Sequence, residues 1–228
     1  MGASRGHGPE RHSPLHPASP AGTNARPQAL DPTRLQAALD HAAVSAPSQA
    51  PALLGALTES AIPFGRSDLE GAAFWLADHF PPAGPTVIGH GDLHPLNLLV
   101  DGEHWTLLDW TSALVADPAY DRAFTTLMLR HPPLAAPAPL RPVLASVGAV
   151  LARRFTTAYQ RAGGTPSDQR TLDWYTNFHA LRILTEFEGW CQDSTGSDHS
   201  LHPWSTVGPV AAQILSRTTE MKVSFVGA

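Results

Sequence analysis

Apolar residues recur at helical spacing along most of the chain from residue 67 onward. The first such segment begins at a capping box, Ser67-Asp68-Leu69-Glu70, and ends at Pro81-Pro82. The longest carries an apolar stripe over residues 140–159 and is stopped by Gly163-Gly164. Further helices are expected from Asp117-Pro118 to about residue 130, after Ser167, and over about residues 206–218. The pattern therefore predicts a mainly α-helical chain.

The first part of the chain has a weaker pattern. Asp31 and Pro32 predict the start of a short helix with Leu35, Leu39 and Ala42 on one face. Residues 46–64 are interrupted by prolines and predict a loop with a short helical piece at 52–57. Residues 1–28 are almost free of apolar side chains and predict a disordered tail, and residues 219–228 predict a frayed tail. We therefore expect one lobe over residues 29–218 and no second domain.

One segment, residues 86–110, has strand character instead. Val87-Ile88, Leu98-Leu99-Val100 and the residues from Trp105 onward predict short strands, and Asp101-Gly102 predicts a two-residue hairpin turn. A hairpin folded at Asp101-Gly102 brings Asn97 and Asp109 close together, because its two arms pair side by side.

Asp92, Asn97 and Asp109 in this segment are the residue types that phosphoryl transfer requires. A hydroxyl nucleophile needs a carboxylate to orient it and accept its proton, and Asp92 is the candidate base. Magnesium needs hard oxygen ligands, which the Asn97 amide and the Asp109 carboxylate provide. The same order of Asp, Asn five residues on, and a later Asp occurs in the protein-kinase catalytic loop.

Three motifs in order, HGDLHPLN at 90–97, LLDW at 107–110 and ADPAYD at 116–121, resemble the aminoglycoside phosphotransferase and choline kinase family. The resemblance covers roughly residues 29–218 and implies the α+β, predominantly α, C-terminal lobe of a protein-kinase-like fold, with helices around a small catalytic β-hairpin. It implies that Asp92 is the base, that Asn97 and Asp109 hold Mg²⁺ or Mn²⁺, and that ATP is the phosphoryl donor. It also implies that Asp121 braces the catalytic loop. His90 is expected to support this loop from behind, and His94 either to shape the loop or to face substrate.

Composition limits the classes of binding partner that the chain suits. The formal net charge of −5 disfavours binding to nucleic acid or an anionic membrane, and no apolar run is long enough to cross a bilayer. The single cysteine, Cys191, allows no internal disulfide, which fits a reducing cytoplasm. The 12 histidines show no metal-binding spacing, and His179 on a partly apolar helix face is expected to be a core histidine.

The family's N-terminal lobe supplies a lysine that pairs the nucleotide phosphates, and the sequence offers no candidate for it. The one lysine is Lys222, in the C-terminal tail, and nothing before Val87 alternates like a sheet. A truncated gene, a misplaced start or frame change, and a partner that supplies the lobe all remain open explanations. The chain by itself is expected to be weakly active or inactive.

The first hypothesis for function is an ATP-dependent phosphotransferase acting on a hydroxyl of a small molecule. The alternative is a non-catalytic remnant or small-molecule-binding module, and a third is a purely structural helical domain. The clustered carboxylates argue against the third, because such groups are costly unless metal or substrate uses them. Glu186, Glu188 and Trp190 could form an acidic, aromatic substrate pocket suited to an amino sugar or a quaternary amine. A solvated helix end there is an equally open interpretation.

Overall fold

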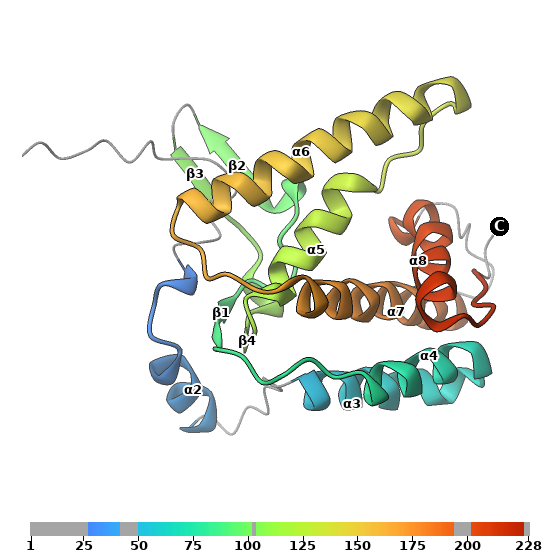
Figure 1. Ribbon diagram of the computed structural model, residues 1–228, viewed down its shortest axis with the longest axis horizontal. Helices are drawn as coiled ribbons and strands as arrows, with labels where there is room; N and C mark the ends of the chain where they lie inside the picture. The colour runs from blue at the N-terminus through green and yellow to red at the C-terminus, as the bar shows by residue number, and fades with distance from the viewer. Residues whose placement is uncertain (1–26, 42–49, 102–103, 194–201, 226–228) are drawn as a thin grey trace, which may run out of the picture.

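The computed structural model describes residues 27–41, 50–101, 104–193 and 202–225 (Figure 1). Its α-helices are α2 (Pro32–His41), α3 (Ala50–Ala61), α4 (Ser67–Asp78), α5 (Ala119–Arg130), α6 (Arg141–Arg161), α7 (Gln169–Asp193) and α8 (Trp204–Thr219). Its strands are β1 (Val87–Gly89), β2 (Leu98–Asp101), β3 (His104–Leu107) and β4 (Leu114–Ala116). Short 3-10 helices cover Ile62–Phe64, Pro95–Asn97, Trp110–Ser112 and Ala138–Leu140. The predicted class, helix-rich α+β, is confirmed.

The long helix α7 is the centre of the packing. Helices α3 and α4 lie along one side of it, α5 crosses its other side, and α8 packs near its C-terminal end (Figure 1). Tyr175, Leu181 and Ile183 on α7 are buried, and Phe124 of α5 belongs to the same buried cluster. Burying one large apolar side chain contributes roughly 1.5–3 kcal/mol, so the buried residues of α7 hold the lobe together.

The strands form two small antiparallel sheets. In one, β2 pairs with β3, with Leu98 opposite Leu107. The arms of the predicted hairpin are thus confirmed, and its turn at 102–103 lies outside the described residues. In the other, β1 pairs with β4, with Ile88 opposite Val115, a pairing that the sequence analysis did not predict. The second sheet matters for the site, because β1 leads directly into the catalytic loop.

Residues 50–61 form a complete helix where the sequence analysis expected a loop with a short helical piece. Pro51 is the second residue of α3, where its missing N–H leaves no helical hydrogen bond unmade. Leu53 and Leu54 are buried, and the helix packs against α4 and α7. Tertiary packing therefore extends the helix beyond what its sequence pattern indicated.

Two expected helix caps differ in the structure. The N-cap of α4 is Arg66, not Ser67, and no side chain caps it. Asp68 accepts a hydrogen bond from the backbone N–H of Leu69 and pairs with the Arg66 guanidinium at 2.8 Å. At the start of α7, Asp168 accepts from the Thr171 N–H, so it takes the role expected of Ser167.

The apolar stripe of α6 is largely exposed. Val143, Val147 and Leu151 have 57%, 48% and 45% of their surface exposed, and Ala152, Phe155 and Tyr159 in the second half of the helix are buried. The reason is that α5 is the main neighbour of α6, which lies across one side of the lobe (Figure 1). The stripe predicted the helix correctly, and its burial is confined to the second half, where α6 meets the lobe.

The lobe-facing residues of both predicted tails make contacts with the lobe. Gln28 is buried, and its side-chain oxygen accepts a hydrogen bond from the Tyr159 hydroxyl. At the other end, Val223 is buried and the backbone N–H of Ser224 donates to Asp68 at 3.0 Å. The remainder of both tails, residues 1–26 and 226–228, lies outside the described residues. None of the described helices has the length and apolar character that a membrane span needs.

Candidate active site

The segment from β1 to β2 places Asp92 in a tight loop. Gly91 has φ +80, a left-handed conformation that favours glycine. A Cβ at Gly91 would overlap the carbonyl oxygen of Ser112 and would lie 2.8 Å from the carbonyl carbon. The loop therefore lies directly against the residues that follow Asp109, which explains why a glycine precedes Asp92.

Asp121 on α5, which the family resemblance implied to brace this loop, makes two hydrogen bonds to its backbone. Its two carboxylate oxygens accept the backbone N–H groups of His90 at 2.7 Å and Gly91 at 2.8 Å. Burial raises the pKa of Asp121, and these two hydrogen bonds oppose that effect. Since both N–H groups are buried, they need this acceptor.

His90 supports the loop from behind, as expected. Its Nε2 lies 2.8 Å from the carbonyl oxygen of Leu108, and its Nδ1 lies 3.3 Å from the backbone N–H of Asp92. A carbonyl can only accept, so the ring proton is assigned to Nε2, which leaves Nδ1 free to accept from Asp92. The His90 ring thereby connects the catalytic loop to Leu108, the residue that follows β3.

Two basic side chains, His94 and Arg182, lie beside the Asp92 carboxylate. His94 Nε2 lies 3.3 Å from one oxygen, and Arg182 Nη2 lies 3.6 Å from the other. Burial raises the pKa of Asp92, but the hydrogen bond from His94 and the charge of Arg182 outweigh it and hold the pKa below its usual value. Asp92 is therefore ionised at neutral pH, the state that a proton acceptor requires.

Arg182 is a site residue that the sequence analysis missed. Its Nη1 donates to the Gly91 carbonyl at 3.0 Å, and its Nε donates to Glu186 at 2.6 Å. Its guanidinium also lies over the Phe124 ring, 5.2 Å from the ring centre. An arginine on the apolar face of α7, with a glutamate four residues later, was the available signal, and only the fold could show that it reaches the loop.

Asn97 lies between Asp92 and the hairpin. Its side-chain nitrogen donates to the Asp92 backbone carbonyl at 2.9 Å, and its own backbone carbonyl accepts from the Leu108 N–H at 2.9 Å. With the amide nitrogen turned toward Asp92, the amide oxygen is left as a possible cation ligand. The hairpin register thus sets Asn97 beside Leu108, one residue before Asp109.

Asp109 follows β3 and is exposed, with a left-handed backbone at φ 57 and ψ 72. A non-glycine residue in that region is uncommon and often marks a functional position. Its carboxylate accepts from the Thr111 hydroxyl at 2.5 Å and from the Thr111 backbone N–H at 3.4 Å. These hydrogen bonds lower the pKa of Asp109, and the negative charge of Asp92 acts in the opposite direction. The two carboxylates therefore lie within electrostatic reach of each other.

The donor set at Asn97 and Asp109 fits magnesium or manganese. Both offer hard oxygen ligands, and Asp92 adds negative charge nearby. The described residues contain no cluster of three or more His, Cys, Asp or Glu side chains arranged for a metal. Two protein ligands suit a cation that keeps several waters and takes its remaining ligands from substrate phosphates.

The residues expected to form an acidic substrate pocket take part in packing contacts. Glu188 pairs with Arg66 at 2.7 Å, which connects α7 to the start of α4. Glu186 pairs with Arg182 and accepts from the Trp204 indole N–H at 2.9 Å. The Trp190 ring packs with the rings of Phe187 and His202. The structure thus already provides cationic or donor partners for both carboxylates.

His179 is a core histidine, as expected. It is fully buried, and its Nε2 lies 2.9 Å from the Tyr120 carbonyl oxygen. Burial lowers the pKa of His179 to about 3, so the ring is neutral in the folded protein.

A helical lobe around a loop and hairpin of this kind defines the class of kinase-like phosphotransferases. The chain belongs to the phosphotransferase enzyme family, whose family model matches residues 14–154. The family that the motifs indicated is thereby confirmed.

Two known proteins show the extent of the similarity. A protein of Ralstonia eutropha JMP134, provisionally named an aminoglycoside phosphotransferase, has a solved structure that superposes with a TM-score of 0.66 at 18% identity. The match covers 88% of this chain and 63% of that protein, so the chain spans less than two thirds of it, and at this identity the likeness shows the fold alone. The uncharacterized protein YcbJ of Bacillus subtilis strain 168 is 49% identical over 49 residues, which is 21% of this chain and 16% of YcbJ.

Proposed function

We propose that the chain carries the catalytic lobe of an ATP-dependent phosphotransferase that acts on a hydroxyl of a small molecule. The observation that carries the proposal is the Asp92 carboxylate, which is held ionised in a braced loop next to Asn97 and Asp109. Membership in the phosphotransferase family supports the same reaction class.

In the proposed reaction, Asp92 accepts a hydrogen bond from the acceptor hydroxyl and orients its oxygen toward the γ-phosphorus of ATP. The hydroxyl proton passes to the Asp92 carboxylate as the new oxygen–phosphorus bond forms. The bond between the γ-phosphorus and the bridging oxygen breaks, and ADP leaves with that electron pair. Asn97 and Asp109 would hold Mg²⁺ or Mn²⁺, which neutralises charge on the phosphates.

The charged groups at the site indicate how much positive charge the acceptor molecule should carry. The groups that meet Asp92 are His94 and Arg182, and both carboxylates of the expected acidic pocket are already paired. A multiply charged amine would have to compete with Arg66 and Arg182 for Glu188 and Glu186. These contacts favour an acceptor with few or no positive charges over a polycationic amino sugar.

The test is Asp92→Asn, with Asp101→Asn as the control. Asp101 ends β2 of the same hairpin and is exposed, so both variants make the same chemical change close together. In a form of the protein that also carries an N-terminal lobe, we expect Asp92→Asn to abolish ADP release in the presence of ATP, Mg²⁺ and a panel of alcohols, and to melt near the wild-type temperature. Asp101→Asn should retain the wild-type rate. Turnover that survives in Asp92→Asn would remove Asp92 from the base role.

A non-catalytic binding module is the second candidate, and the position of the lysine favours it. Lys222, the chain's one lysine, is exposed and follows α8, at the end of the chain away from the catalytic loop in sequence. The lysine that pairs the nucleotide phosphates in this family makes a charge-assisted hydrogen bond, which contributes about 1.5–3 kcal/mol. Calorimetric titration of ATP and Mg²⁺ into the chain separates the candidates. Binding of a small-molecule alcohol with no nucleotide binding or transfer would favour the binding module.

A further inference from the structure

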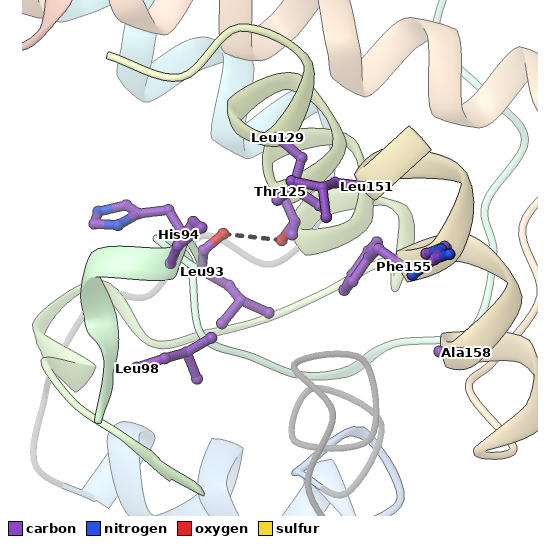
Figure 2. A pocket seen from close by; sticks show the side chains of 10 residues that line it. Leu93, His94, Leu98, Thr125, Leu129, Leu151, Phe155 and Ala158 are labelled. Atoms are coloured by element: carbon purple, nitrogen blue, oxygen red, sulfur yellow. Dashed lines mark hydrogen bonds between the residues drawn. The ribbon is translucent and has the colours of Figure 1, made fainter. Parts of the chain in front are cut away.

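A pocket of about 180 Å³ lies between α6 and the segment that follows Asp92 (Figure 2). Leu93 and Leu98 line it from the loop side, Leu129 from α5, and Leu151 and Phe155 from α6. Almost all of the lining is apolar. A pocket with this lining and volume suits an apolar ring; an enclosed engineered cavity of about 150 Å³ holds benzene.

The pocket lies behind the catalytic loop. Leu93 and His94 both line the pocket; Figure 2 shows the Leu93 side chain directed into it, whereas the His94 ring points away from Phe155. That ring is the one that reaches Asp92, with Nε2 at 3.3 Å from the carboxylate. The backbone at His94 is extended, at φ −143 and ψ 166, so neighbouring side chains point to opposite faces. An occupant of the pocket would therefore contact the back of the loop and leave the reaction centre open.

The charge around the pocket indicates which apolar compound it suits. Arg154 on α6 also lines the pocket, and within the described part of the chain its guanidinium makes no hydrogen bond or ion pair. No lining residue is acidic. A compound with an apolar ring and a carboxylate on a short chain would bury the ring between Leu93 and Phe155 and place its carboxylate near Arg154.

We propose that this pocket is a second ligand site, which binds a small apolar carboxylate behind the catalytic loop. The Leu93 carbonyl accepts a hydrogen bond from the Thr125 hydroxyl at 2.9 Å, and Thr125 also lines the pocket. A bound ring packs against both partners of this hydrogen bond. Occupancy therefore restrains the residue next to Asp92, which gives the ligand a means of influencing the loop without touching the reacting groups.

The test uses three compounds that share a phenyl ring on a three-carbon chain and carry a negative, no and a positive charge: 3-phenylpropanoate, 3-phenylpropanamide and 3-phenylpropylamine. Each is titrated into the full chain without nucleotide, and binding is followed by ¹H–¹⁵N NMR. We expect the amide signals of Leu93, Thr125 and Phe155 to shift together. The carboxylate should bind more tightly than the neutral amide, and the amine least tightly. Because no ATP is present, a failure of phosphoryl transfer does not affect the result.

Matched variants on α6 identify the site. Leu151 lines the pocket and is 45% exposed, whereas Val150 is 48% exposed and lines no part of it. Leu151→Glu should weaken binding of the carboxylate and the amide at least about tenfold, because it places a charge at an apolar mouth. Val150→Glu should leave binding unchanged, and both variants should fold, since both positions face solvent.

Arg154 is tested against its neighbour Arg153, which is also exposed and does not line the pocket. Arg154→Ala should reduce carboxylate binding about two- to fivefold, the range for an exposed ion pair, and leave amide binding unchanged. Arg153→Ala should change neither. The proposal is overturned if the three reporter residues do not shift, if Val150→Glu weakens binding as much as Leu151→Glu, or if the amine binds best.

Discussion

Gly91→Ala is the substitution whose effect the structure specifies most directly. Gly91 has φ +80, and so does Gly163, around which a Cβ would meet nothing within 4 Å. At Gly91 the same Cβ would overlap the Ser112 carbonyl oxygen and approach the carbonyl carbon to 2.8 Å. Ordinary carbon–carbon contacts begin at about 3.5 Å, so the loop must move by roughly 0.7 Å or more. The two glycines therefore share the same backbone strain and differ in steric overlap.

The magnitudes follow from this comparison. A left-handed conformation costs an L-residue about 1–2 kcal/mol, which is the whole expected loss in Gly163→Ala. Overpacking adds about 1–3 kcal/mol in Gly91→Ala, for a total loss of roughly 2–5 kcal/mol in the free energy of unfolding. Urea unfolding followed by tryptophan fluorescence measures both.

Gly91→Ala should also lose activity, because the displacement separates Asp92 from the residues that follow Asp109. The measurement is the rate of ADP release in the form that carries an N-terminal lobe, under conditions where the variant is still folded, compared with Gly163→Ala at the same fraction folded. Equal stability losses in the two variants, or full activity in Gly91→Ala, would show that the loop does not lie against Ser112 as described.

Three further outcomes are expected. Arg182→Met should lower the free energy of unfolding by about 1.5–3 kcal/mol, because it removes the charge-assisted hydrogen bond to the loop, and it should raise the pKa of Asp92. Arg170→Met, at the exposed start of α7, should change neither quantity. Equal urea midpoints for the two variants would contradict the prediction. His179 is neutral in the folded protein, with a pKa of about 3, and protonates near pH 6.5 in the unfolded chain. Its contribution to the free energy of unfolding is therefore complete above pH 6.5 and falls by about 1.4 kcal/mol per pH unit as the pH drops toward 3. The free energy of unfolding, measured by urea between pH 7 and 4, should therefore fall less steeply with decreasing pH in His179→Gln than in the wild type. Manganese-induced NMR broadening should centre on Asn97 and Asp109, and broadening spread evenly over the surface would contradict a shared metal site.

Local sequence alone determined the parts of the site that lie near each other in the chain. The Asp92–Asn97 spacing and the hairpin arms around residues 98–107 follow from strand and turn chemistry over about twenty residues. Asp121 was placed correctly through the family motif, and the structure supplies its physical role, which is to accept two buried N–H groups of the loop. Short-range pattern and motif order were sufficient for these features.

Only the tertiary structure decided the features that join distant segments. Arg182 reaches the catalytic loop across 91 residues, and β1 pairs with β4 through a register that neither short strand specifies by itself. From the sequence, Glu186 and Glu188 could have faced a ligand or a partner. In the folded lobe, each forms an ion pair with an arginine. The stripe on α6 has the same apolar pattern whether or not another helix covers it. Hydrophobic period identifies a helix face, but burial depends on which neighbours the fold brings to that face, and that is a property of the whole lobe.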